Sequence, residues 1–91
     1  MSAVSREVQI TNKRGLHARA SAKFVNMASE LDAQIEVEKD GNRVCGTSIM
    51  GLMMLGAGTG SKITIEATGN EAAAVADALE KLVSSGFGEE D

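Results

Sequence analysis

The sequence contains no proline, tryptophan or tyrosine, and its 91 residues include two phenylalanines, one cysteine and one histidine. A single cysteine excludes an internal disulfide and is typical of proteins in a reducing compartment. Because one histidine and one cysteine cannot supply the ligands of a zinc site, we expect no metal and no cofactor. The shortage of aromatic rings also removes the stacking platforms that many proteins use to bind single-stranded nucleic acid.

The formal net charge is −4 at pH 7. It argues against nucleic acid as a partner, because phosphate binding needs a basic surface. The N-terminus, MSAVSREVQI, lacks the apolar segment of a signal peptide, and no apolar run approaches the ~20 residues of a membrane span. We therefore expect a cytoplasmic protein without a membrane partner. With no repeat and no linker, residues 1–91 predict a single domain with an acidic tail at 88–91, and nothing requires more than a monomer.

Alternation of apolar and polar residues predicts four strands. The first covers residues 4–10 and the second residues 33–37, each with one apolar and one polar face. Asp40 and Gly41 follow as a hairpin-turn signal. A short returning strand is expected at 42–46 and a fourth strand at 63–67.

Apolar residues at helical spacing predict helices at 18–31, 48–55 and 72–83. For the last helix, Asn70 is the expected N-cap and Gly86 the expected end. The element order is therefore β-α-β-β-α-β-α. Strands with one polar face favour a four-stranded antiparallel sheet that helices cover on one side. The predicted fold class is α+β, an open-faced β-sandwich.

The only histidine lies in the segment GLHARASAKFV, residues 15–25. His17 directly precedes a predicted helix, where free backbone N–H groups and the helix dipole favour an anion. Gly15, which has no side chain, allows another molecule to approach closely. Arg19 adds a planar guanidinium group that suits phosphate oxygens. This combination is suited to carrying a phosphoryl group on the imidazole.

The neighbourhood of His17 in the sequence is basic, with Lys13, Arg14 and Lys23 close by. No Asp or Glu lies near in sequence to orient the imidazole as a base, which favours transfer onto histidine over hydrolysis. A lone histidine near a helix start is, however, more often a capping or surface residue. The residues alone leave both interpretations open.

GLHARASAKFV resembles the active-site segment of the HPr family of histidine phosphocarriers, in which the pattern is typically G-L-H-A-R-P-A. The segment GTSIMGLMMLGAG, residues 46–58, resembles the family's regulatory serine segment, and the likeness extends over about residues 8–82. The resemblance implies that Nδ1 of His17 accepts a phosphoryl group from a phosphohistidine of enzyme I and passes it to an EIIA-type protein. Arg19 and the backbone of Ala18 and Arg19 would bind the phosphate. Such a protein is a carrier and not an enzyme in the usual sense.

Two features separate this sequence from the common family pattern. Ala20 stands where the family usually has proline, so we expect a less rigid helix start and altered transfer rates. ITNK at 10–13, ATG at 67–69 and the ending SSGFGEED resemble the nitrogen-related NPr branch. SIMG at 48–51 resembles HPr of bacteria that have the serine kinase. The branch stays open.

The second predicted helix is apolar on nearly all sides. If Leu52 and Leu55 face the core, Ile49, Met50 and Met53 lie outside, and methionine is favoured on surfaces that fit several partners. By the resemblance this surface, with Lys23, docks enzyme I and EIIA proteins. The competing interpretation is that the methionines fill a core that is short of aromatic rings.

Ser48 is the expected N-cap of that helix. The resemblance adds that HPr kinase/phosphorylase modifies this serine in some bacteria, which would slow phosphorylation of His17. Cys45 is predicted to be a small packed residue. Two other functions remain: a regulatory interaction protein that acts through Ile49, Met50 and Met53 with little phosphotransfer, and, more weakly, a carrier with a prosthetic group on Ser48.

Overall fold

In the computed structural model, which describes residues 3–89, strands and helices follow each other in the predicted order. The α+β class and the open-faced arrangement are confirmed. The elements are the strands β1 (Ala3–Gln9), β2 (Gln34–Lys39), β3 (Asn42–Cys45) and β4 (Lys62–Thr68), the helices α1 (Ala18–Ala28), α2 (Ile49–Met54) and α3 (Ala72–Ser84), and a short 3-10 helix, η1 (Gly86–Gly88).

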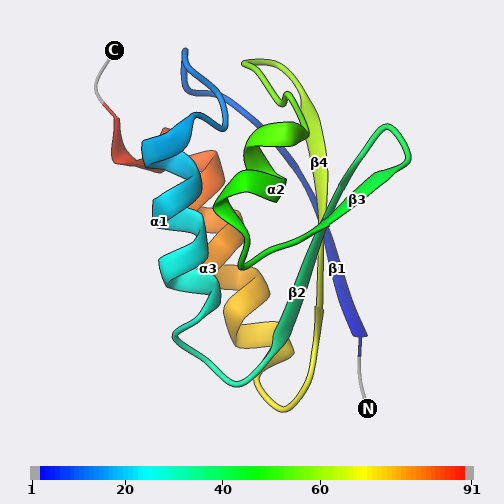
Figure 1. Cartoon of the computed structure of the whole chain (residues 1–91). Coiled ribbons are helices and arrows are strands. Elements are labelled where there is room, and N and C mark those ends of the chain that lie inside the picture. Colours follow the sequence, from blue (N-terminus) through cyan, green and yellow to red (C-terminus); the bar gives the residue numbers. More distant parts are fainter. Residues whose placement is uncertain (1–2, 90–91) are drawn as a thin grey trace.

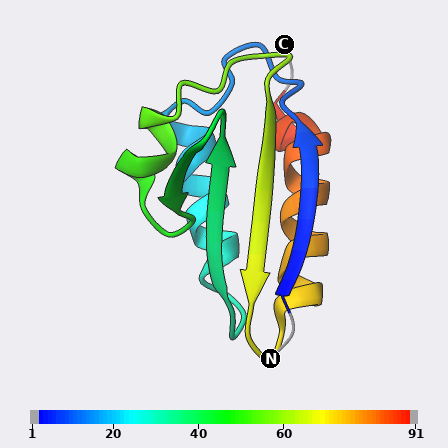
Figure 2. The ribbon, with the colours of Figure 1, turned by 90° about the vertical axis from the view of Figure 1, so that its right-hand side faces the viewer.

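The four strands form one antiparallel sheet in the order β1-β4-β2-β3. All three helices lie on one side of it, as Figure 1 shows with the sheet seen nearly edge-on. In Figure 2 the open face of the sheet is toward the viewer, with α1 and α3 behind it. The first and fourth strands are neighbours although more than fifty residues separate them, and Val8 lies opposite Ile63. This pairing joins the first strand of the chain to the last strand of the sheet.

The core lies between the sheet and the helices. Along β2 and β4 the alternation is strict, so that Ile35, Val37 and Ile65 are buried while Gln34 and Glu36 face water. Burial of each large aliphatic side chain contributes roughly 1.5–3 kcal/mol. The two aromatic side chains are both fully buried and supply the largest volumes in the core, namely Phe24 of α1 and Phe87 of η1.

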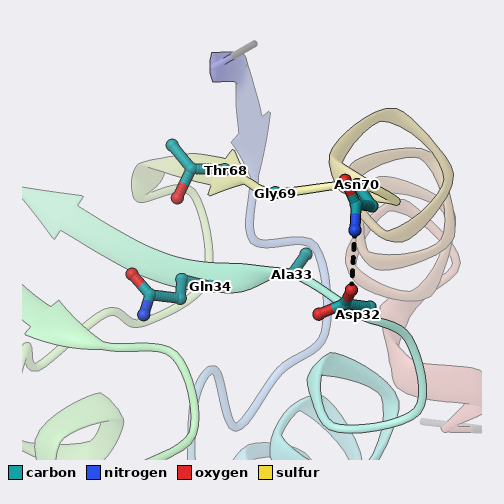
Figure 3. A pocket seen from close by; sticks show the side chains of 6 residues that line it. All are labelled: Asp32, Ala33, Gln34, Thr68, Gly69 and Asn70. Atoms are coloured by element: carbon teal, nitrogen blue, oxygen red, sulfur yellow. Dashed lines mark hydrogen bonds between the residues drawn. The ribbon is translucent and has the colours of Figure 1, made fainter. Parts of the chain in front are cut away.

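Two predictions about the helices need correction. The first helix ends at Ala28, earlier than expected. Asn70 does not cap α3, because its Nδ2 donates to Asp32 Oδ2 at 3.1 Å, and the N-cap position belongs to Glu71, which makes no side-chain capping bond. Figure 3 shows this contact at the edge of a hollow that lies between the end of β4 and the start of β2. Asn70 therefore ties two loops together across the structure.

Cys45 is exposed and not packed. In the alternation of the edge strand β3, the half-buried position falls to Val44, which turns Cys45 outward. The Sγ atom lies 3.0 Å from Thr47 Oγ1, and this hydrogen bond lowers the pKa of the Cys45 thiol.

On the open face of the sheet, Arg43 bridges three carboxylates from neighbouring strands. Its guanidinium lies 2.7 Å from Glu36, 3.2 Å from Glu38 and 2.8 Å from Glu66. The hydrogen bond from Arg43 lowers the pKa of Glu66 below its ordinary value of 4.5. A carboxylate whose pKa is lowered by folding stabilises the protein above its ordinary pKa, and the stabilisation is lost as the pH falls through the lowered value.

We predict that Glu66→Gln lowers the urea midpoint at pH 7, and that the difference from the wild type disappears as the pH falls through the lowered pKa of Glu66. The matched control is Glu7→Gln on β1, since Glu7 has no ion-pair partner in residues 3–89. A pH-independent difference for the Glu66 variant would contradict this account.

Candidate functional site

His17 is the N-cap of α1, with an extended backbone at φ −77° and ψ −179°. Its carbonyl oxygen accepts the first helical hydrogen bond, from Ser21 N–H at 2.8 Å. Its Nδ1 atom accepts a hydrogen bond from the backbone N–H of Arg19 at 3.3 Å. Since Nδ1 is an acceptor, it carries no proton in this arrangement. His17 therefore caps the helix. The same geometry places Nδ1 at the helix start, where an anion is favoured, so a capping role does not exclude a phosphate-binding role.

A tight backbone arrangement places His17 at this point. Gly15 has a positive φ of 64°, and Leu16 N–H donates to the carbonyl of Ala57 at 2.9 Å. A Cβ atom on Gly15 would lie 2.3 Å from Ala57 O. The glycine is therefore needed for contact with the chain's own loop after α2, and not for the approach of another molecule as the sequence suggested.

Glu89, at the C-terminal end of the described chain, completes the surroundings of the imidazole. Its Oε2 atom lies 2.5 Å from His17 Nε2, and its Oε1 accepts a hydrogen bond from Asn12 Nδ2 at 3.0 Å. These two hydrogen bonds, the one from His17 first, lower the pKa of the Glu89 carboxyl. Only 22% of the His17 side chain and 13% of the Glu89 side chain are exposed. The carboxylate that the local sequence lacks is thus supplied from 72 residues away.

The residues predicted to bind phosphate lie around the same helix start. Ala18 and Arg19 open α1, where the first backbone N–H groups have no helical acceptor. The exposed guanidinium of Arg19 has no hydrogen-bond or ion-pair partner within the described part of the chain. Ala20, in place of the family's usual proline, is fully buried in the first turn. An anion beside Nδ1 would therefore meet backbone donors and a cation that no other residue in 3–89 neutralises.

Lys23 is positioned differently from the other predicted residues. Its Nζ donates to the carbonyl of Phe87 at 2.8 Å, so the ammonium group is tied to the C-terminal segment. It lies one helical turn beyond Arg19 on α1. The same segment also supplies Glu89, so Lys23 helps to hold the surroundings of the imidazole.

The second helix exposes a group of large apolar side chains that we call the methionine patch: Ile49, Met50, Met53 and Met54. Their exposed fractions are 39%, 70%, 42% and 80%, while Leu52 and Leu55 are buried as expected. Met54, the most exposed of the patch, was not among the predicted partner-binding residues. The helices α1 and α2 are in contact, and Figure 1 shows the patch-bearing helix beside the start of α1.

Ser48 caps α2, and its Oγ accepts a hydrogen bond from Gly51 N–H at 3.0 Å. The side chain is half-buried at the edge of the methionine patch. A modification of this hydroxyl would therefore alter both the helix cap and the neighbouring apolar surface.

Comparison with known proteins supports one family. Residues 4–85 match the family described as "PTS HPr component phosphorylation site". The chain is 44% identical to phosphocarrier protein HPr of Cupriavidus necator over 86 residues, 94% of this chain and 97% of that one. It is 42% identical to phosphocarrier protein NPr of Shewanella violacea over 89 residues, 98% of each chain.

The crystal structure of phosphocarrier protein HPr from Bacillus anthracis superposes with a TM-score of 0.87 and 44% identity, covering 91% of this chain and 99% of that one. The four-stranded sheet, open on one face and covered by helices on the other, is thus the fold of a phosphocarrier of known structure. The chain belongs to the HPr family of phosphocarrier proteins.

Sequence reasoning missed Asn12, Glu89 and Met54. The signal for Glu89 was indirect: Phe87, one of two aromatic residues, needs burial and therefore carries the tail back to the core. Within residues 3–89, no group of three His, Cys, Asp or Glu side chains could hold a metal ion, and no helix is long and apolar enough to cross a membrane. Of the expected tail at 88–91, Gly88 belongs to η1, and residues 90 and 91 lie outside the described chain.

We predict that Gly15→Ala destabilises the protein by about 2–5 kcal/mol, because positive φ and a clash with a carbonyl oxygen act together. Gly56→Ala is the matched control: its φ is 65°, and a Cβ there has nothing within 4 Å. It should cost only about 1–2 kcal/mol. Urea unfolding measures both, and equal losses would mean that the contact with Ala57 adds nothing.

Proposed function

We propose that this protein carries a phosphoryl group on Nδ1 of His17. The observation that carries the proposal is that the two ring nitrogens of His17 have different hydrogen-bond partners. Nε2 faces Glu89, whereas Nδ1 accepts the backbone N–H of Arg19 at the start of α1. The nitrogen with the available lone pair is therefore the one placed where a helix favours an anion.

The transfer uses the groups of α1 directly. The lone pair of Nδ1 attacks the phosphorus of a donor phosphohistidine, a new N–P bond forms, and the electron pair of the broken bond returns to the donor ring. The backbone N–H groups of Ala18 and Arg19 and the guanidinium of Arg19 then surround the phosphate oxygens and stabilise their charge. Onward transfer reverses these steps and returns the pair to Nδ1.

The donor in this proposal is enzyme I of the phosphotransferase system, and the acceptor is an EIIA-type protein. The relatives' description as phosphocarriers supports the role. The methionine patch, next to the start of α1, provides the apolar contact that a transient partner needs, with Lys23 at the other edge of the site. We propose that the protein acts as a monomer in the cytoplasm.

Incubation with phosphoenolpyruvate and the enzyme I of the same organism should add one acid-labile phosphoryl group, detected by intact-protein mass spectrometry. His17→Ala should gain none, because no other residue of the chain is a histidine. If the wild type gains no mass while enzyme I is shown to be phosphorylated, the carrier function is wrong.

We further propose that Ser48 is a regulatory phosphorylation site for an HPr kinase/phosphorylase. A phosphate there is tolerated at the N-terminus of α2 and adds negative charge at the edge of the methionine patch. The added charge would weaken docking of enzyme I, as charge does at the core of an interface.

Ser48→Asp should slow phosphorylation of His17 by enzyme I roughly ten-fold, equivalent to about 1.4 kcal/mol. Ser48→Asn is the matched control, since asparagine caps a helix as well as aspartate but carries no charge. Initial rates at sub-saturating carrier measure the effect. Similar rates for the two variants would exclude a charge effect at this position.

The exposed methionine patch also favours a second candidate: a regulatory interaction protein that acts through this surface with little phosphotransfer. The two functions differ in what they require of His17. Loss of partner regulation in His17→Ala supports the carrier, whereas full regulation by that variant supports the interaction protein.

A further inference from the structure

The C-terminal segment returns to the start of α1 (Figure 1). There the carboxylate of Glu89 contacts the imidazole of His17. Both carboxylate oxygens of Glu89 are engaged, Oε2 by His17 Nε2 at 2.5 Å and Oε1 by Asn12 Nδ2 at 3.0 Å. The hydrogen bond from His17 keeps the pKa of Glu89 below its usual range, so the side chain is ionised at neutral pH. The imidazole is therefore held from the side opposite α1.

Contacts of the neighbouring residues fix the position of the Glu89 side chain, which is only 13% exposed. Phe87, two residues earlier, is 1% exposed, and its carbonyl accepts a hydrogen bond from Lys23. The backbone N–H of Glu89 donates to Gly86 O at 3.0 Å. These contacts fix the chain on both sides of the point at which the carboxylate turns toward His17.

The side chain of Asn12 also helps to hold the Glu89 carboxylate. Its Nδ2 group donates to Gly15 O at 2.9 Å and to Glu89 Oε1 at 3.0 Å, which settles the orientation of the amide. The opposite atom, Oδ1, is buried without a hydrogen-bond partner in the described chain. A buried acceptor is normally satisfied, so this amide is arranged around its two donor contacts. One of the two is the carboxylate that holds His17.

The chemistry of the ring explains what such a carboxylate does. When Nδ1 of a neutral imidazole forms a bond to phosphorus, both nitrogens are substituted and the ring acquires positive charge. The Nε2–H bond remains, and its hydrogen bond to a carboxylate then becomes charge-assisted and stronger. The aspartate of serine-protease triads acts on an imidazolium in the same way, since it selects the tautomer and stabilises the charged ring.

We propose that Glu89 is a positioning residue for phosphoryl transfer, holding the Nε2 proton of His17 so that Nδ1 is the nucleophile and the phosphorylated ring is stabilised. This inference rests on the proposed carrier function. The Nε2 proton stays in place when the N–P bond forms and when it breaks, so neither transfer needs a proton to move. Without the carboxylate the ring also populates the tautomer with hydrogen on Nδ1, which has no lone pair for attack at that atom.

The test compares Glu89→Gln with Glu90→Gln, which removes the same charge from the next position in the sequence. The ¹⁵N chemical shifts of the His17 ring report which nitrogen carries the proton, and enzyme I with phosphoenolpyruvate supplies the phosphorylation rate. We expect an unprotonated Nδ1 and equal rates in the wild type and Glu90→Gln. In Glu89→Gln we expect a mixture of tautomers and a rate lower by about 10–100-fold.

Glutamine is a demanding substitute because it has one acceptor oxygen where His17 and Asn12 present two donors. Unchanged tautomer and rate in Glu89→Gln would overturn the proposal, and so would a faster rate, which would make the segment an inhibitory strap. An equal loss in Glu90→Gln would also overturn it by assigning the effect to tail charge. If the wild type accepts no phosphoryl group, the carrier function fails, while the ring spectra still report whether Glu89 selects the tautomer.

Discussion

The free N–H groups at the start of α1 are the constraint around which the site is organised. Helices usually satisfy such groups with the oxygen of a serine, threonine or aspartate. Here the acceptor is a ring nitrogen of His17. The capping hydrogen bond to the ring nitrogen is long, at 3.3 Å, so little stability is lost when another acceptor replaces it. In the proposed carrier function, a phosphoryl group bonded to that nitrogen would bring three oxygens to the same N–H donors. The local requirement of the helix and the proposed phosphoryl transfer therefore involve the same atom, Nδ1 of His17.

The packing of the core extends this site to the far end of the chain. With two phenylalanines and no tryptophan or tyrosine, the protein has few large rings to fill the space between sheet and helices, and both phenylalanines are buried. One of them, Phe87, lies two residues before Glu89. Burial of that ring brings the terminal segment back to α1, where Lys23 and Asn12 hold it. The contacts that hold residues 87–89 against α1 are therefore also the contacts that orient the imidazole of His17.

The surface beside the histidine follows from the length of α2. A helix of six residues buries Leu52 alone, and Leu55 just after it completes the contact with the core. The remaining apolar side chains have no interior to enter and form the methionine patch. Flexible methionine side chains fit differently shaped partners, which suits a carrier that must meet a donor and an acceptor in turn. Because Ser48 caps this helix, charge added there changes the same surface.

Much of this protein is determined by its sequence. The period-two pattern of 33–37 and 63–67 and the apolar stripe of the helices predict the sheet with one covered face, because these patterns depend on neighbouring residues alone. The position of His17 before a helix and the cap at Ser48 are local for the same reason. Errors arose where a distant segment competed for a side chain: Asp32 takes the amide of Asn70, and the loop at Ala57 occupies the space beside Gly15.

Only the tertiary structure decided which groups surround the imidazole. Glu89 is 72 residues from His17, and its contact depends on the burial of Phe87, the antiparallel pairing of β1 with β4 and the packing of α3 against α1. No spacing rule within the chain encodes that distance, since it results from how all elements pack at once. The local sequence determined where the imidazole of His17 lies, and the closure of the fold determined which carboxylate contacts it.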